Sequence, residues 1–383
     1  ADFLETRLGA KDEALAELRA IEGLGLADAD TLARIGLLEE EVNDHDAAVG
    51  AYTRALESEP THAVAVGGLV RLLDDAAKQT AIARYEKALW ERFEAGELDA
   101  STLQAMHSAA TWRGHAERAA AIRAVEQTLG LDAPRAEPWT FEQDGVFSAA
   151  LWDRETSPVL DDVLRRVGSS LFKPRARTKK VTPNDPIYVE LERLCEQLGV
   201  RVASVALSTD VSAPAAYAST DLAIHWLMPS ECRDGLDERS RFLAGRLAWA
   251  APRGAGWLLD DSASSAAGKI AALLRAARCD VAVGEAMLPA AEVKLRRAAR
   301  RSVQEAVGGA TLSAASLLTF ARSLHRSGDR AGLLACGDIG IALATVLHGV
   351  TTIAALRASA RGLDLARFCM DAESPLWRSD GRR

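Results

Sequence analysis

The stretch AAVGAYTRALESEP, residues 47–60, contains the residue spacing that decides the fold of the N-terminal part. Its small Ala48 and its aromatic Tyr52 are four residues apart, so they lie on one face of a helix. The same spacing begins at Ala14 and again at Ala81, at intervals of 34 and then 33 residues. A period of this length predicts helix pairs, each of which buries its apolar face against the next pair.

This pattern resembles the tetratricopeptide repeat family. The best unit spans residues 29–62, and its matching residues are Leu32, Ile35 and Gly36 on a first helix and Ala48, Tyr52, Ala55 and Pro60 on a second. In the third unit Val70 stands where the family has a small glycine, and residues 102–129 predict a weaker fourth pair or cap. The resemblance implies a curved solenoid whose inner helices form a groove for a protein partner. The candidate groove residues are Arg34, Leu38, Glu41, Val42, Arg71 and Asp74.

A second domain follows a predicted linker. The segment LDAPRAEPWTFEQD, residues 131–144, contains two prolines and interrupts the helical periodicity, which places a boundary between a domain 1–130 and a domain 145–383. The second domain is predicted to be α+β, and the whole chain mainly α. Helices are expected at 158–168, 185–198, 238–250, 264–278, 289–306, 313–326 and 329–345, strands at 201–207 and 221–228, and turns between the two strands.

The order of these elements in 185–360 resembles the metallopeptidase domain of the HtpX and CAAX-prenyl-protease type, which implies a zincin-like fold. The residues that carry the resemblance are Asp329-Arg330-x-Gly332 and Gly337-Asp338. Active members of that family carry H-E-x-x-H on the helix that matches 238–250. Two histidines at i and i+4 bind one zinc ion there, and the glutamate activates the water that the metal holds.

The ligand residues of that family are missing from this chain. The matching turn is Gly245-Arg246-Leu247-Ala248-Trp249, in which neither glycine nor tryptophan can bind zinc. His325 stands at the third ligand position, four residues before Asp329, but one imidazole does not hold a catalytic zinc. We therefore expect no metal, no cofactor and no catalytic residue, with His325 as a buried histidine and Asp329 in a buried salt bridge or helix cap. Arg246 is a candidate partner for that acid.

Charge and composition limit the remaining possibilities. The chain has 383 residues and a net charge of −8, and residues 1–135 contain 14 basic and 25 acidic residues. An acidic first third argues against binding of nucleic acid by that part. The five cysteines are odd in number and widely spaced, and no signal peptide is visible, so we expect free thiols and a cytoplasmic location. The uncharged run 339–356 is predicted to form two buried helices and no membrane span.

Two basic clusters are candidate contacts. Residues Lys173, Arg175, Arg177, Lys179 and Lys180 lie in a predicted loop, and Lys294, Arg296, Arg297, Arg300 and Arg301 line a predicted helix. No aromatic residues alternate with these charges, so stacking on nucleic acid bases is unsupported. The sequence favours a non-enzymatic protein-binding scaffold. The alternatives are a divergent zinc peptidase with a rebuilt site and, less favoured, a nucleic-acid-binding protein.

Overall fold

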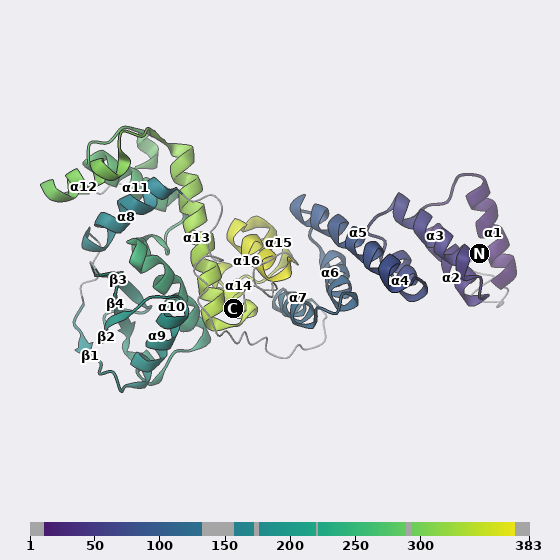
Figure 1. Cartoon of the computed structure of the whole chain (residues 1–383), viewed down its shortest axis with the longest axis horizontal. Helices are drawn as coiled ribbons and strands as arrows, with labels where there is room; N and C mark the ends of the chain where they lie inside the picture. Colours follow the sequence, from purple (N-terminus) through teal and green to yellow (C-terminus); the bar gives the residue numbers. More distant parts are fainter. Residues whose placement is uncertain (1–10, 132–156, 172–175, 220, 289–292, 372–383) are drawn as a thin grey trace. The chain divides into compact units, whose positions relative to one another are not determined.

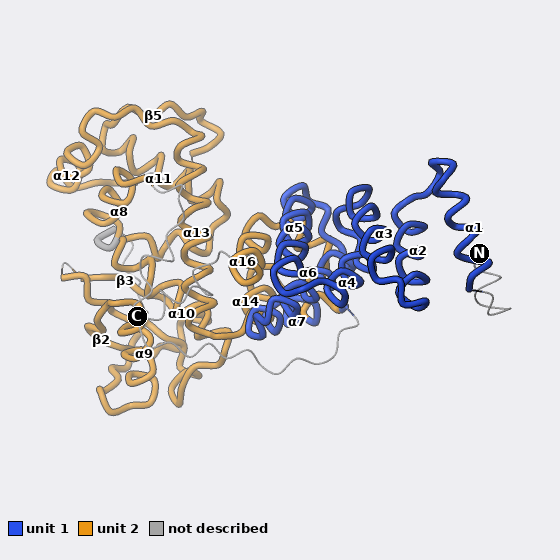
Figure 2. Tube along the Cα trace, turned by 45° about the vertical axis from the view of Figure 1, so that its right-hand side comes forward, with its two compact units in different colours: residues 1–127, 131–135 blue, residues 128–130, 136–383 orange. Residues whose placement is uncertain are grey.

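The structure is a computed structural model, and it describes residues 11–131, 157–171, 176–219, 221–288 and 293–371. These residues are mainly helical and include a small mixed sheet (Figure 1). The chain divides into two compact units, residues 1–127 with 131–135 and residues 128–130 with 136–383 (Figure 2). Of the predicted linker 131–144, only residue 131 lies within the described part of the chain.

Unit 1 is built from consecutive helices, the first six of which pack against one another in sequence order. They are α1 (Lys11–Gly23), α2 (Ala29–Glu41), α3 (His45–Ser58), α4 (Ala63–Leu72), α5 (Asp75–Glu94), α6 (Ala100–Trp112) and α7 (Ala116–Thr128). Aspartates at positions 28, 44, 74 and 99 begin four of them, because each carboxylate accepts a hydrogen bond from the backbone N–H three residues later. The weak helical pair predicted for 102–129 is present as α6 and α7.

The buried ring of Tyr52 on α3 is packed between two glycines. A Cβ atom added to Gly36 on α2 would lie 2.5 Å from ring carbon Cε1 of Tyr52, and one added to Gly68 on α4 would collide with the opposite edge. The hydroxyl of Tyr52 donates a hydrogen bond of 2.9 Å to Glu40 Oε2, and Glu40 also accepts two hydrogen bonds from Arg71. Burial and this hydrogen bond raise the pKa of Tyr52 well above its usual value. The small residue of α4 that packs against the Tyr52 ring is therefore Gly68, two positions before Val70.

Unit 2 combines helices with a small sheet. Its helices are α8 (Pro158–Leu171), α9 (Pro186–Gln197), α10 (Glu238–Ala250), α11 (Ala263–Ala276), α12 (Arg297–Val307), α13 (Ala314–Cys336), α14 (Ile339–Val346), α15 (Ile353–Ala358) and α16 (Ala360–Met370). Helices α9 and α10 contact strands of the sheet, and α13 packs along α10 and α11 (Figure 1). The core of the unit lies between these helices and the sheet, and it includes Val205, Trp226, Ala248 and Leu324.

The larger sheet contains β1 (Lys179–Lys180), β2 (Val202–Ser208), β4 (Ile224–Pro229) and β3 (Ala215–Ala218), in that order. Strands β2 and β4 are parallel, and β1 and β3 are antiparallel to their neighbours. The segment between the two predicted strands is turn-rich as expected, but it also contains the short strand β3, which was not predicted. Its sequence, AAYA, contains no β-branched residue, and its pairing with β4 supplies the order that local propensity does not.

The separate helices predicted at 313–326 and 329–345 are in fact one helix, α13, followed by the short α14. Ser313 and Ser316 form a capping box at the start of α13, and Gly337, with φ of 68°, ends it. Gly328 lies inside this helix and does not break it. A Cβ atom at this position would lie 3.1 Å from Leu259, so the glycine allows close packing of the helix against Leu259. The helix predicted at 289–306 begins only at Arg297, and residues 289–292 lie outside the described residues.

The uncharged run 339–356 forms α14, then a turn, and then the first residues of α15. The prediction of two helices is confirmed. Among the described residues, no helix combines the length and hydrophobicity that crossing a bilayer requires.

Candidate functional site

Helices α10 and α13 cross closely at Gly245, in the turn that the resemblance aligns with a metal-binding motif. A Cβ atom on Gly245 would collide with Ala335, and one on Gly332 would lie 2.7 Å from the carbonyl oxygen of Phe242. Both glycines therefore allow the two backbones to approach each other. This crossing places Arg246 of α10 beside Asp329 of α13.

Asp329 is a buried carboxylate shared by two arginines. It is 1% exposed, and its Oδ1 lies 3.0 Å from Nε of Arg246. Arg361 of α16 donates two hydrogen bonds of 2.7 Å, one to each carboxylate oxygen of Asp329. The ion pair between Arg246 and Asp329 that the sequence suggested is present. The second partner, Arg361, was not predicted.

Arg246, which the resemblance aligns with the general base of the peptidases, is fixed by several contacts. It is 5% exposed, and its Nη2 donates a hydrogen bond of 2.6 Å to the carbonyl oxygen of Leu259. Burial lowers the pKa of Arg246, while Asp329 acts in the opposite direction. A guanidinium at this place cannot accept a proton from a water molecule, so it cannot serve as a general base.

His325 is buried and engaged. It is 1% exposed, and its Nε2 lies 3.0 Å from the carbonyl oxygen of Leu258, which makes that nitrogen the hydrogen-bond donor. Burial lowers the pKa of His325, which favours the neutral ring. Within the described part of the chain, no group of three or more His, Cys, Asp or Glu side chains is arranged to hold a metal ion.

Trp249 and His225 both contact other side chains of unit 2. Trp249 is 3% exposed within the core of unit 2, and the Arg253 guanidinium lies 4.4 Å from the centre of its ring. His225 lies on β4, where its Nδ1 is 2.8 Å from the Ser204 hydroxyl and its ring stacks on Tyr217 at 4.8 Å.

A cleft of about 270 Å³ opens beside Arg246. Its charged and polar lining consists of Arg239, Arg246, Asp260, Thr345, His348 and Arg361. Its apolar lining consists of Ala213, Pro214, Leu243, Leu247 and Leu259. The cleft was not predicted, because its walls come from segments separated by more than a hundred residues of sequence.

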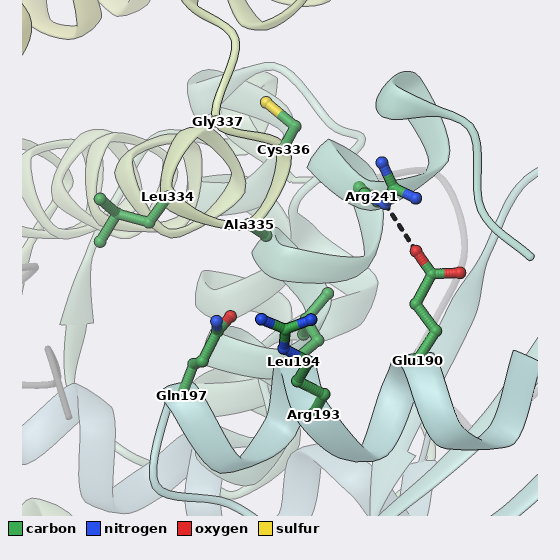
Figure 3. A pocket seen from close by; sticks show the side chains of 9 residues that line it. All are labelled: Glu190, Arg193, Leu194, Gln197, Arg241, Leu334, Ala335, Cys336 and Gly337. Atoms are coloured by element: carbon green, nitrogen blue, oxygen red, sulfur yellow. Dashed lines mark hydrogen bonds and ion pairs between the residues drawn. The ribbon is translucent and has the colours of Figure 1, made fainter. Parts of the chain in front are cut away.

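A second hollow in unit 2, of about 380 Å³, lies between α9, α10 and the end of α13 (Figure 3). Glu190 in its wall accepts a hydrogen bond of 2.6 Å from Arg241 and is thereby neutralised. Burial raises the pKa of Cys336 to about 12, so the thiolate needed for nucleophilic attack is scarce at neutral pH. This hollow offers no activated nucleophile.

Several predicted groove residues of unit 1 have structural roles. Leu38 is 1% exposed and belongs to the core, so its prediction as a groove residue was wrong. It shares the apolar face of α2 with Ile35, which turns it toward α3 and away from solvent. Arg71 is held by Glu40, and Asp74 caps α5.

The remaining candidates on α2 and just beyond it are nearer the surface. Glu41 forms an ion pair of 2.7 Å with Lys11, and Arg34 is half-buried. Val42 is 43% exposed. Binding by these residues stays a prediction.

An apolar cavity of about 680 Å³ opens instead between α3, α4 and α5. Its lining residues include Leu56, Pro60, Leu69, Leu73 and Tyr85, with Glu57 and Arg84 as exposed charged residues. Tyr85 is 1% exposed, and within the described residues its hydroxyl has no hydrogen-bond partner. Burial raises the pKa of Tyr85 to about 12, so the group stays a neutral donor. The repeat spacing indicated Tyr85 as a packing residue and gave no sign of the cavity.

The structure describes only some residues of the two basic clusters. Lys173 and Arg175 lie outside the described residues. Lys179 and Lys180 form the exposed edge strand β1, which corrects the prediction of a loop, and the backbone N–H of Arg177 donates to Asp210. In the second cluster, Lys294 and Arg296 precede α12.

Comparison of the chain with protein families, with curated proteins and with solved structures gives no match.

Proposed function

We propose that the chain is a non-enzymatic protein-interaction scaffold or adaptor. In this proposal, unit 1 is a tetratricopeptide-repeat-like solenoid that binds a segment of a partner protein. Unit 2 is a zincin-like α+β domain that has lost peptidase chemistry. The five free cysteines support the predicted location in the reducing cytoplasm.

The observation that carries the proposal is the cavity between α3, α4 and α5. Leu56, Leu69 and Leu73 provide an apolar surface for a hydrophobic side chain of the partner. Tyr85 adds its aromatic ring to the same wall, while its hydroxyl oxygen is buried and is not exposed to a bound segment.

The contacts in unit 2 support the part of the proposal that assigns no enzymatic activity to the chain. Arg246 replaces the general base, and Asp329 is neutralised by Arg246 and Arg361. His325 already donates to Leu258. Both His325 and Asp329 are therefore engaged in contacts within the unit and are not free to activate water for attack on a peptide bond.

The test uses peptides selected from a display library on the full chain, with affinity measured by fluorescence anisotropy. Leu73 is half-buried in the cavity wall, so Leu73→Glu places a charge in the cavity and weakens the selected peptides by at least about tenfold. Val42→Glu is the matched control on the inner-helix side and changes affinity by less than about twofold. Circular dichroism checks that both variants are folded.

Equal binding to wild type and Leu73→Glu, with loss of binding in Val42→Glu, would place the partner on the inner helices and contradict the cavity assignment. Hydrolysis of the selected peptides by the purified chain would contradict the non-enzymatic assignment.

A further inference from the structure

More positively than negatively charged side chains line the cleft beside Arg246. Arg239 and Arg246 are seven residues apart on α10, so they lie on one face of the helix with Leu243 between them. Arg361 reaches the cleft from α16 and His348 from the turn after α14. Three arginines therefore line a space of about 270 Å³.

The carboxylates nearby do not balance these arginines. Asp329 is shared between Arg246 and Arg361 and so cancels one of their two charges. Asp260 lies 3.7 Å from Nη1 of Arg246, but its side chain is 84% exposed, so water weakens the pairing. Arg239 is exposed and adds a further positive charge at the cleft.

The rest of the lining is apolar and limits the kind of anion. Pro214, Leu243, Leu247 and Leu259 form this part of the wall. A free inorganic anion would leave these side chains in contact with water, whereas an acid with a short hydrocarbon body would cover them. The volume is just below that of sites for drug-sized ligands, so it suits a small molecule or the end of a chain.

We propose that this cleft binds a small organic carboxylate with a branched apolar body, held by Arg239, Arg246 and Arg361. Arg239 suits this task because its planar fork of N–H donors matches the two oxygens of a carboxylate, while Arg246 and Arg361, whose N–H groups are partly taken by Asp329 and Leu259, add positive charge. The hydroxyl of Thr345 at the same wall already donates to the carbonyl oxygen of Ile341, so the arginines are the donors for the carboxylate. The site is independent of the partner cavity in unit 1.

The experiment measures binding to the full chain by isothermal titration calorimetry and ligand-observed NMR. The probe is 4-methylpentanoate, and its neutral control of equal shape is 4-methylpentanamide. The acid is expected to bind at least about tenfold more tightly than the amide. N-acetyl-leucine tests whether the same chemistry at a peptide C-terminus is accepted, because it adds an amide bond beside the carboxylate.

Two exposed arginines provide the matched variants. Arg239→Gln should weaken binding of 4-methylpentanoate about tenfold, whereas Arg233→Gln, outside the cleft in the turn after β4, should leave it unchanged. Equal affinity for acid and amide, no detectable binding of the acid, or no effect of Arg239→Gln would overturn the proposal. Inorganic phosphate that competes at equal affinity would also overturn it, because the apolar wall would then contribute nothing.

Discussion

Two adjacent glycines of α4, Gly67 and Gly68, should respond in opposite ways to the same substitution. A Cβ atom on Gly68 would lie within 2.6 Å of three ring carbons of Tyr52, where carbon atoms normally stay about 3.5–4.0 Å apart. The ring cannot move away, because Gly36 contacts its other side. A Cβ atom on Gly67 meets nothing closer than 3.8 Å.

The magnitudes follow from these distances. Overpacking of a filled core costs about 1–3 kcal/mol, and this outweighs the helix-propensity gain of about 1 kcal/mol from Gly to Ala. We expect Gly68→Ala to lower the free energy of unfolding of unit 1 by about 1–2 kcal/mol. Gly67→Ala should raise it by up to about 1 kcal/mol.

Hydrogen exchange of peptides from α2 to α5, measured by mass spectrometry at increasing urea concentration, reports the local free energy of unfolding in the full chain. Peptides from α9 and α13 in unit 2 serve as the internal control. If Gly68→Ala is as stable as Gly67→Ala, Tyr52 does not fill the space between the two helices, and the assignment of the repeat packing is refuted.

Two further predictions concern unit 2. Asp329→Asn removes the negative charge between two buried arginines and should lower the free energy of unfolding by about 3–5 kcal/mol, seen as a lower thermal midpoint in calorimetry. The surface pair of Asp162 and Arg166 gives the control, since Asp162→Asn should cost less than about 1 kcal/mol; equal losses would refute the buried role. Because burial lowers the pKa of His325 below its usual value of about 6.5, its contribution to stability is complete above that pH and is lost as pH falls. The stability difference between wild type and His325→Gln should therefore shrink from about pH 7.5 to about pH 5 in urea titrations, and a constant difference would mean that His325 is not buried as a neutral ring.

Local signals in the sequence predicted most helices of the described chain. Aspartates and serines mark helix starts by capping, and the spacing of Ala48 and Tyr52 predicted the packing of α3. One strand was missed. Strand β3 has weak propensity and depends on its pairing with β4.

The sites were harder to predict because their residues come from distant segments. The pairing of Arg246 with Asp329 followed from the resemblance to a peptidase, whereas Arg361 belongs to no motif and meets Asp329 only in the folded unit. The cavity at Tyr85 was not predicted for the same reason, since residues of three helices form its wall. Periodicity indicates that a side chain is buried, but it does not show whether the hydroxyl finds a partner.

The zinc content of the purified full chain tests the central claim most directly. After dialysis against zinc and then against buffer, the account predicts less than about a tenth of an equivalent of zinc per chain, with the same value in His325→Gln. About one equivalent of zinc, lost in His325→Gln and accompanied by peptide hydrolysis in the wild type, would contradict it.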